Sequence, residues 1–258
     1  MRLPQGFSAT QLPLLFAHRG IQTEFPENSM SAFTACREND IPGIELDVQL
    51  SADGKVVVFH DETLDRVSNS TGKVCDQTWD QLKTIDIGSK FNPVFSNERI
   101  PLLADVLDAF GDEIYFDIEI KNKHSHDSGL SLAVANVIRA VKPKAPLIIS
   151  SFNPLELNRF KKLEPQIATA AIYCQDKELP WYLRSGLGKH IGRANGYKPE
   201  YTIAPIRLTK SRVSGSWVIP WTVNSTAAAS ALLQKGAIGL ISDDPRPLVQ
   251  TACDFLAH

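Results

Sequence analysis

The chain has 258 residues and a mass of 28.5 kDa, which suits one large domain better than a small module. Hydrophobic residues make up 43% of it and charged residues 22%, and the mean hydropathy is −0.13, as in ordinary globular proteins with a buried core. A formal net charge of −2 excludes the strongly basic composition that binding of polyanions requires. We therefore expect no nucleic acid partner, and any anionic ligand must be met by local charge.

The N-terminal segment and the cysteines bear on the cellular location. Pro4 and Pro13 interrupt the apolar residues before His18, so the segment does not resemble a signal peptide. No apolar run reaches the roughly 18 residues of a membrane helix. The four cysteines show no C-x-x-C spacing, which indicates reduced thiols rather than zinc ligands or disulfides. We expect a cytoplasmic protein without integral membrane association.

Short β-branched or apolar runs alternate with segments of helical spacing, which predicts repeated βα units and an α/β fold. About eight strands are expected, the number that a closed TIM (β/α)8 barrel requires. The same alternation is compatible with an open doubly wound sheet, which is the alternative fold. The predicted strands are residues 14–17, 44–49, 114–120, 147–151, 167–173, 201–204, 217–222 and 239–242.

Helices are predicted between several of these strands, and Asn or Ser residues stand where two of them begin and can cap their free amides. The predicted helices are residues 30–39, 130–141, 154–163 and 226–235. The stretch 50–101 is too long for one crossover, because it holds another apolar run at 56–59 and then a turn-rich segment. We interpret it as an insertion after the second strand, within a single domain that spans residues 1–258.

Acidic residues share one face of the second and third predicted strands, because side chains alternate along a strand. Glu45 and Asp47 lie on this face of the second strand. Glu119 lies on the corresponding face of the third strand, with Asp117 one inward position below it. A half-solvated antiparallel strand gives the same alternation. The surrounding helices favour instead a barrel whose interior or mouth is lined by these side chains.

Three converging carboxylates stay ionised together only when a cation compensates them. All-oxygen ligation by Glu45, Asp47 and Glu119 predicts a hard divalent ion, Mg²⁺ or Ca²⁺, with Mn²⁺ as a further choice. Asp117, one layer lower in a packed barrel, is expected to satisfy a buried polar partner instead.

Two histidines follow short apolar runs. His18 directly follows the first strand, and His60 follows the apolar run 56–59. A lone histidine is more often structural than catalytic, but two at strand ends, with a Glu/Asp pair between them in sequence, favour an acid–base pair. One imidazole can remove a proton while the other donates one.

An ordered series of short motifs runs through nearly the whole chain, from residue 18 to residue 245. They are Phe16-Ala17-His18-Arg19-Gly20, Pro26-Glu27-Asn28-Ser29, Glu45-Leu46-Asp47-Val48, Val58-Phe59-His60-Asp61, Ile118-Glu119-Ile120-Lys121, Ser151-Phe152, Trp221-Thr222-Val223-Asn224 and Ile241-Ser242-Asp243-Asp244-Pro245. In this order and spacing the motifs resemble the glycerophosphodiester phosphodiesterase family. Ser29 and Ser242 stand where that family commonly has Thr, which leaves the catalytic set intact. The resemblance implies a TIM barrel with a small insertion after the second strand.

The resemblance also implies a substrate and its binding groups. Metal-dependent hydrolysis would convert glycerophosphodiesters, such as glycerophosphocholine or glycerophosphoethanolamine, to sn-glycerol 3-phosphate and an alcohol. A divalent ion held by the three carboxylates would bind a phosphoryl oxygen and the glycerol hydroxyls. Arg19 and Lys121 would add positive charge around the phosphate.

By the same resemblance, we assign His18 as the base toward the glycerol 2-hydroxyl and His60 as the acid toward the leaving alcohol. The reaction would pass through a cyclic phosphate that water then opens. One alternative is a lysophospholipase D-like enzyme acting on lysophospholipids, which the lack of a membrane-seeking helix disfavours. The other is a barrel that only binds phosphodiesters, which the complete set of candidate residues disfavours.

A basic stretch at 177–212 is hidden by the near-neutral net charge, since it holds eight Lys or Arg residues against two acidic ones. It is expected either to steer an anionic substrate to the barrel mouth or to form a solvated outer helix.

Overall fold

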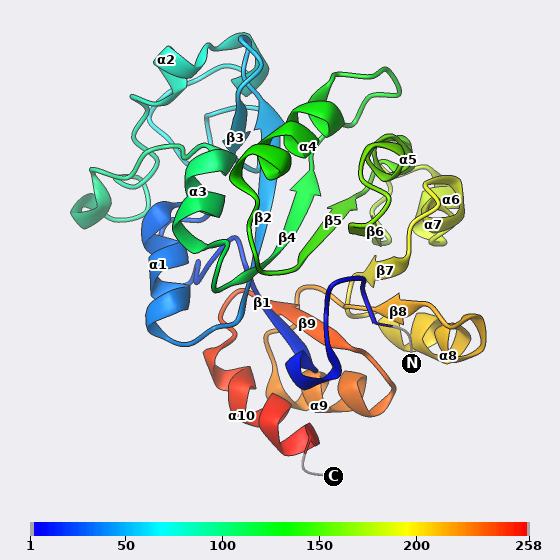
Figure 1. Ribbon diagram of the computed structural model, residues 1–258. Helices are drawn as coiled ribbons and strands as arrows, with labels where there is room; N and C mark the ends of the chain where they lie inside the picture. Colours follow the sequence, from blue (N-terminus) through cyan, green and yellow to red (C-terminus); the bar gives the residue numbers. More distant parts are fainter. Residues whose placement is uncertain (1–2, 257–258) are drawn as a thin grey trace.

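The computed structural model describes residues 3–256, with side chains for all of these but 211–214 and 256, and confirms the predicted barrel (Figure 1). Eight parallel strands pair in the order β8-β7-β6-β5-β4-β2-β1-β9. Backbone N–H groups of Ile238 and Ile241 donate to the carbonyls of Val218 and Pro220, at 3.1 and 3.0 Å, and so join the two ends of the sheet. The strands are β1 (Leu14–His18), β2 (Gly43–Leu50), β4 (Tyr115–Ile120), β5 (Leu147–Ser151), β6 (Ala168–Tyr173), β7 (Gly196–Pro199), β8 (Trp217–Val218) and β9 (Gly239–Ser242).

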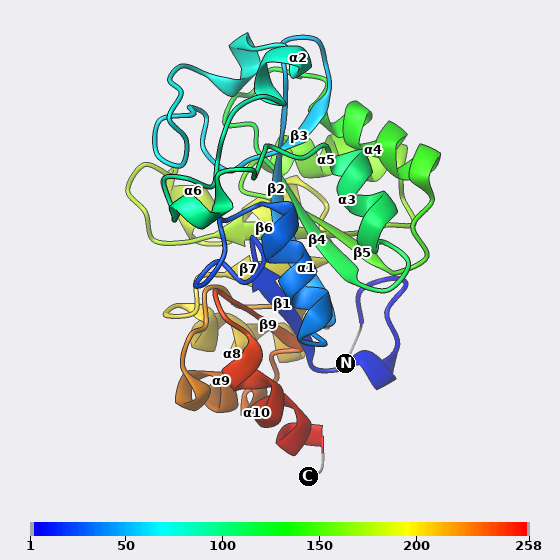
Figure 2. The same ribbon diagram turned by 90° about the vertical axis from the view of Figure 1, so that its left-hand side faces the viewer.

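Helices cover the outer face of the barrel, and Figure 2 shows α1 lying along β1 and β2. The side chains of Ser29, Asn153 and Ser225 accept backbone N–H groups where α1, α5 and α9 begin. Within the described residues, no helix is long and apolar enough to cross a membrane. The helices are α1 (Met30–Glu38), α2 (Trp79–Leu82), α3 (Leu103–Phe110), α4 (Leu130–Val141), α5 (Pro154–Leu163), α6 (Trp181–Arg184), α7 (Gly188–Ile191), α8 (Ala204–Ser214), α9 (Thr226–Gln234) and α10 (Arg246–Leu256), with 3₁₀ turns at Ala9–Gln11, Val74–Asp76 and Pro93–Phe95.

The sixth predicted strand, at residues 201–204, was wrong, because these residues form a turn and the first residue of α8. The strand is instead β7, whose glycine, lysine and proline are residue types with low strand propensity. Packing overrides propensity here. A Cβ atom at Gly196 would lie 2.1 Å from the indole of Trp217, so only glycine lets the neighbouring strand β8 come this close.

The chain between β2 and α3 builds a small structure beside the barrel, coloured cyan in Figure 1. It begins with β3 (Val56–Val58), which pairs antiparallel with the end of β2, Val58 lying opposite Val48. The segment has its own apolar core, made of Val57, Phe59, Leu64, Val74, Leu82, Ile87 and Ile100. Because β3 runs back along β2, the residue after Phe59 is brought to the carboxyl end of that strand.

A charged pair lies inside the barrel at the level of Glu45. The Nζ atom of Lys198 on β7 lies 2.7 Å from Oδ2 of Asp117, and both side chains are almost fully buried. Ser150 on β5 completes the group, donating to Asp117 at 2.6 Å and accepting from Lys198 at 3.0 Å. The expectation of a buried polar partner for Asp117 is confirmed. Lys198 belongs to the basic stretch 177–212, so that stretch is not wholly a surface feature.

Removing this lysine should destabilise the fold. Lys198→Met leaves the Asp117 carboxylate buried without its cation, which costs about 3–5 kcal/mol of unfolding free energy, measured by urea denaturation. Lys83→Met, which breaks the exposed pair of Lys83 with Asp80, is the control and should cost less than about 1 kcal/mol. The double variant Lys198→Met/Asp117→Leu should recover part of the loss, because no buried charge is left. Equal losses in Lys198→Met and Lys83→Met would contradict the buried pair.

Candidate active site

The three predicted carboxylates meet at the carboxyl end of the barrel. Glu45 and Asp47 lie on β2, and Glu119 lies on β4 directly opposite Asp47 in the strand register. One oxygen from each lies within 4.8 Å of the others, and the three side chains are buried, with exposed fractions of 2%, 1% and 7%. The side-chain alternation read from the sequence therefore does bring these residues together.

Two cations flank this cluster. Nζ of Lys121 lies 2.9 Å from Glu119 and 3.3 Å from Asp47, and Nε of Arg19 lies 3.3 Å from Asp47 on another oxygen. Burial opposes the charge of Asp47, but Lys121 and Arg19 outweigh it and hold the pKa of this carboxyl below its usual value. Both basic residues expected near a phosphate are thus beside the carboxylates.

Glu45 is the least compensated of the three acids. Its carboxylate accepts the backbone N–H of Arg19 at 3.3 Å, and Nε2 of His18 lies 4.0 Å from the same oxygen. Burial, followed by the charge of Asp47, raises the pKa of Glu45 well above its usual value. A buried set of three carboxylates with one left so poorly neutralised fits a hard divalent cation with oxygen ligands.

His18 ends β1 and is held by an acidic partner. Its Nδ1 lies 2.7 Å from Oδ1 of Asp243, which directly follows β9, and Gln22 donates to that carboxylate at 2.6 Å. Asn224 donates to the other oxygen of Asp243 at 2.6 Å. Burial favours the protonated form of Asp243, but its hydrogen bonds with His18 and Asn224 keep the pKa of this carboxyl low. This pairing leaves Nε2 of His18 facing Glu45.

His60 has a similar partner on the segment after β3. Its Nδ1 lies 2.6 Å from Asp61, and Arg66 binds the same carboxylate through Nε at 2.6 Å. Burial raises the pKa of Asp61, but the hydrogen bonds from Arg66 and His60 outweigh it and bring the value to about 2. Arg66 also makes two contacts of 2.7 Å with Glu27, which in turn binds Arg19 at 3.0 Å. One ion-pair chain therefore links the His60 segment to Arg19.

Loop geometry fixes these groups. Arg19 and Asn28 adopt left-handed backbone conformations, with φ of 58° and 55°. The two are tied together, because Asn28 N–H donates to the Arg19 carbonyl at 2.9 Å and the Asn28 amide donates to Asp47 at 2.9 Å. Gln49 donates to the carbonyls of Phe59 and Asp61, at 2.9 and 2.6 Å, and so holds the backbone on both sides of His60.

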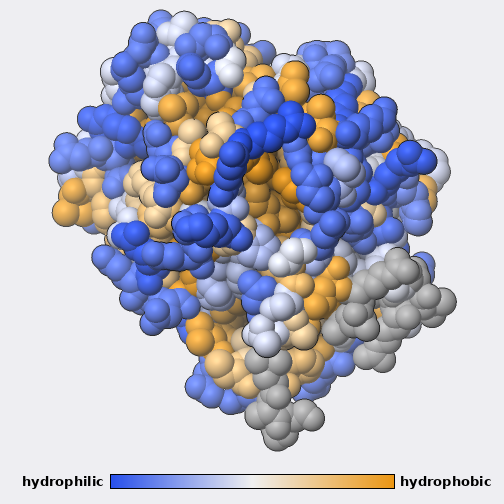
Figure 3. Space-filling model, viewed as in Figure 1, coloured by the Kyte–Doolittle hydropathy of each residue, from blue (hydrophilic) through white to orange (hydrophobic). Residues whose placement is uncertain are grey.

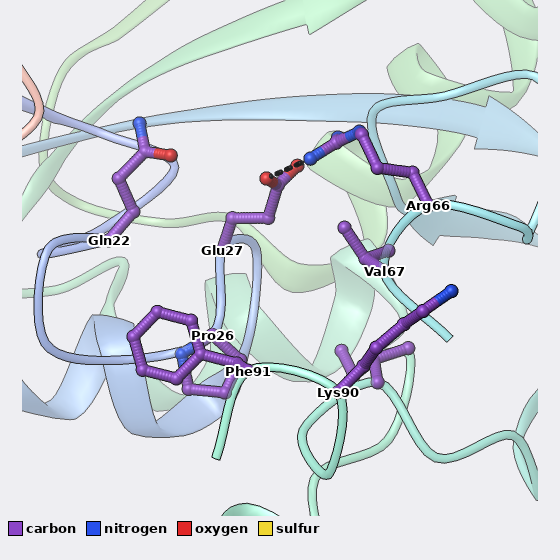
Figure 4. Close-up of a pocket in the computed structure, with 8 residues that line it drawn as sticks. Gln22, Pro26, Glu27, Arg66, Val67, Lys90 and Phe91 are labelled. Carbon is purple, nitrogen blue, oxygen red and sulfur yellow. Dashed lines mark hydrogen bonds and ion pairs between the residues drawn. The ribbon is translucent and has the colours of Figure 1, made fainter. Parts of the chain in front are cut away.

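Two hollows open on the molecule near these groups. One, of about 310 Å³, lies beside the Glu27–Arg66 pair, with Phe91 and Lys90 among its walls (Figure 4). The other, of about 530 Å³, lies among residues that follow β6, β7 and β8. In the view of Figure 3 polar residues dominate the surface, with apolar residues showing between them near its centre.

The sequence reasoning found the carboxylates, the histidines and the two cations, but gave no role to Asp243, Asp61, Gln22 or Arg66. Asp243 belongs to the last of the sequence motifs and directly follows a predicted strand. That position is the signal in the sequence that its side chain lies at the mouth of the barrel. The contact of Asp243 with His18 joins residues 225 positions apart, and no local pattern encodes that.

Comparison with known proteins identifies the family of the chain. The model of the glycerophosphoryl diester phosphodiesterase family matches residues 18–246. A glycerophosphodiester phosphodiesterase of Caldanaerobacter subterraneus is 35% identical over 92% of this chain and 96% of its own length. One of Bacillus altitudinis is 34% identical over 90% of this chain and 94% of its own.

Solved structures share the fold over nearly the whole chain. A phosphodiesterase of Oleispira antarctica, in complex with the product sn-glycerol-3-phosphate, superposes with a TM-score of 0.79 at 27% identity, covering 95% of this chain and 98% of that one. The glycerophosphodiester phosphodiesterase of Thermotoga maritima gives a TM-score of 0.72 at 26% identity, covering 92% and 97%. Together with the sequence matches, these likenesses show that the chain belongs to the glycerophosphoryl diester phosphodiesterase family of enzymes.

Proposed function

We propose that this enzyme hydrolyses glycerophosphodiesters to sn-glycerol 3-phosphate and an alcohol, with a divalent ion bound by Glu45, Asp47 and Glu119. The observation that carries this is the convergence of these buried carboxylates with Arg19, Lys121 and His18 at one end of the barrel. The Oleispira relative, bound to sn-glycerol-3-phosphate, supports the product. Mg²⁺, Ca²⁺ and Mn²⁺ all suit such oxygen ligands.

The phosphodiester would lie over the carboxylates, between the two cations. When bound, the ion supplies positive charge that a phosphoryl oxygen and the glycerol hydroxyls can share with the protein. Arg19 and Lys121, which lie on opposite oxygens of Asp47, would place positive charge on two sides of the phosphate. Arg19 is oriented by Glu27, and Lys121 by Glu119.

The two histidines face different charges. Asp243 contacts Nδ1 of His18 at 2.7 Å and orients the ring, so Nε2 faces Glu45 at 4.0 Å, on the side of the proposed ion site. Burial, helped by the charges of Lys121 and Arg19 and opposed by that of Asp47, lowers the pKa of His60, which suits the neutral form of a base. We therefore propose His60 as the base and His18 as the acid, the reverse of the assignment made from the sequence.

The proton transfers then balance. His60 takes the proton of the glycerol 2-hydroxyl, whose oxygen bonds to phosphorus, while the bond from phosphorus to the alcohol oxygen breaks and His18 protonates that oxygen. Water then opens the cyclic phosphate with the roles exchanged. His18 takes a proton from water, and His60 returns one to the glycerol oxygen, which leaves both residues as they began.

Purified enzyme should release sn-glycerol 3-phosphate from glycerophosphocholine, and a coupled dehydrogenase assay measures this release. EDTA should abolish turnover, and Mg²⁺, Ca²⁺ or Mn²⁺ should restore it. Lysophosphatidylcholine, assayed in parallel, tests the lysophospholipase D alternative, which gains support only if the lysolipid is the better substrate. No turnover of either substrate with any ion would refute the proposed hydrolysis and favour a barrel that only binds phosphodiesters.

Ion binding should also be visible without turnover. Each effective ion should raise the thermal unfolding midpoint of the wild-type enzyme, because a ligand that binds only the folded state stabilises it. Glu45→Gln should lose most of this rise, while Glu38→Gln, an exposed glutamate at the end of α1, should keep it. An undiminished rise in Glu45→Gln would place the ion elsewhere.

The histidine roles can be separated by the leaving group. His18→Ala and His60→Ala should each lower kcat for glycerophosphocholine by about 10²–10⁴-fold. With a p-nitrophenyl ester of glycerol phosphate, whose alcohol leaves without protonation, His18→Ala should recover most activity and His60→Ala should not. In the wild-type enzyme kcat/KM should rise with pH through a pKa below 6.5, the ordinary value for histidine, and His60→Ala should lose this limb. Recovery of His60→Ala alone would restore the original assignment.

A further inference from the structure

The larger of the two hollows lies on the same rim of the barrel as the carboxylates, but beyond β6, β7 and β8. Its walls are Cys174, Asp176, Glu200, Tyr201, Trp221 and Thr222, and its volume is about 530 Å³. Each of these residues follows one of those three strands, so all of them lie at the carboxyl ends. Active sites of such barrels are built at this end.

The hollow combines negative charge with aromatic rings. Within the described part of the chain, neither Asp176 nor Glu200 makes a salt bridge, and Asp176 accepts only a local backbone N–H at 2.9 Å. Asp176 and Glu200 both line the hollow together with Cys174, whose thiol pKa is raised by burial and then by the charges of these two carboxylates. Tyr201 is 41% exposed beside them.

Trp221 gives the hollow a fixed wall. Its indole N–H donates to the carbonyl of Lys198 at 2.9 Å, and its ring packs edge-on against Phe152 at 5.7 Å. Because the tryptophan is already held in this way, little side-chain conformational entropy is lost when a ligand binds. Carboxylates together with the faces of Trp and Tyr rings form a site that attracts organic cations.

The hollow is connected through the chain to His18, the proposed general acid. The segment that supplies Trp221 and Thr222 continues to Asn224, which donates to Asp243 at 2.6 Å, and Asp243 binds His18. His18 is the group we assign to protonate the leaving alcohol. The alcohol is therefore expected to point from the phosphate toward this part of the rim.

We propose that the hollow lined by Asp176, Glu200, Tyr201 and Trp221 receives a leaving alcohol that carries an ammonium group, so that the enzyme prefers zwitterionic glycerophosphodiesters. This inference rests on the proposed function. The charges of the mouth match such a substrate at both ends, because Arg19 and Lys121 meet the phosphate while the two carboxylates meet the ammonium.

Two substrates of equal shape test the charge. Glycerophosphocholine is compared with its 3,3-dimethylbutyl analogue, in which a neutral carbon replaces the quaternary nitrogen. The measured quantity is the ratio of kcat/KM for the two substrates. Because this ratio is compared between variants, the intrinsic difference between the leaving groups cancels.

Glu200→Gln, Asp176→Asn and Tyr201→Leu should each lower the ratio about three- to fivefold, and the two carboxylate changes together about tenfold. Asparagine at 176 keeps the oxygen that accepts the backbone N–H, so the loop should hold. Glu38→Gln and Asp108→Asn, both exposed on helices that lead to the amino ends of β2 and β4, are the matched controls and should keep the wild-type ratio.

The outcomes are distinct. A ratio that does not change in the three variants, or an equal loss for both substrates, overturns the inference while leaving the hydrolysis in place. Failure of the wild-type enzyme to cleave either substrate instead refutes the proposed function. Increased KM for glycerophosphocholine in the variants, with the neutral analogue less affected, is the result that supports a cation subsite.

Discussion

The structure depends on holding three carboxyl groups together in one buried place. Glu45, Asp47 and Glu119 repel one another, and burial makes each charge costlier than in water. Positively charged side chains at two levels of the barrel offset this negative charge. Lys121 and Arg19 lie beside Asp47, and Lys198 lies at the level of Glu45, where it neutralises Asp117 and also lowers the pKa of Glu45. What stays uncompensated is centred on Glu45, the place that a divalent ion would fill.

Much of this was predictable because a strand alternates its faces. Once helices cover the apolar side, every second residue of β2 and β4 has to face the interior, and the parallel register sets Asp47 opposite Glu119. The eighth strand and the position of His18 follow from equally local signals. The prediction failed for β7, because its glycine and proline are residue types with low strand propensity and only the packing of Trp217 on Gly196 explains the strand.

The partners of the histidines lay beyond such reasoning. His18 meets Asp243 only because closure of the barrel sets β9 beside β1, and His60 meets the mouth only because β3 folds back along β2. The roles of two histidines depend on these neighbours rather than on their own motifs. His18 contacts Asp243 and faces Glu45, whereas His60 shares Asp61 with Arg66 and lies near Lys121 and Arg19, the cations beside Asp47.

The near-neutral net charge of −2 conceals this arrangement, since positive and negative groups are separated on one rim rather than absent. Arg19 and Lys121 lie over β1, β2 and β4, and Asp176 and Glu200 lie beyond β6 and β7. Under the proposed function, a molecule with one anionic and one cationic end would gain from both groups only in one orientation, the one that would turn its alcohol oxygen toward His18. Charge separation across the mouth would therefore orient the substrate as well as bind it, and the same barrel closure that brings Asp243 to His18 sets that direction.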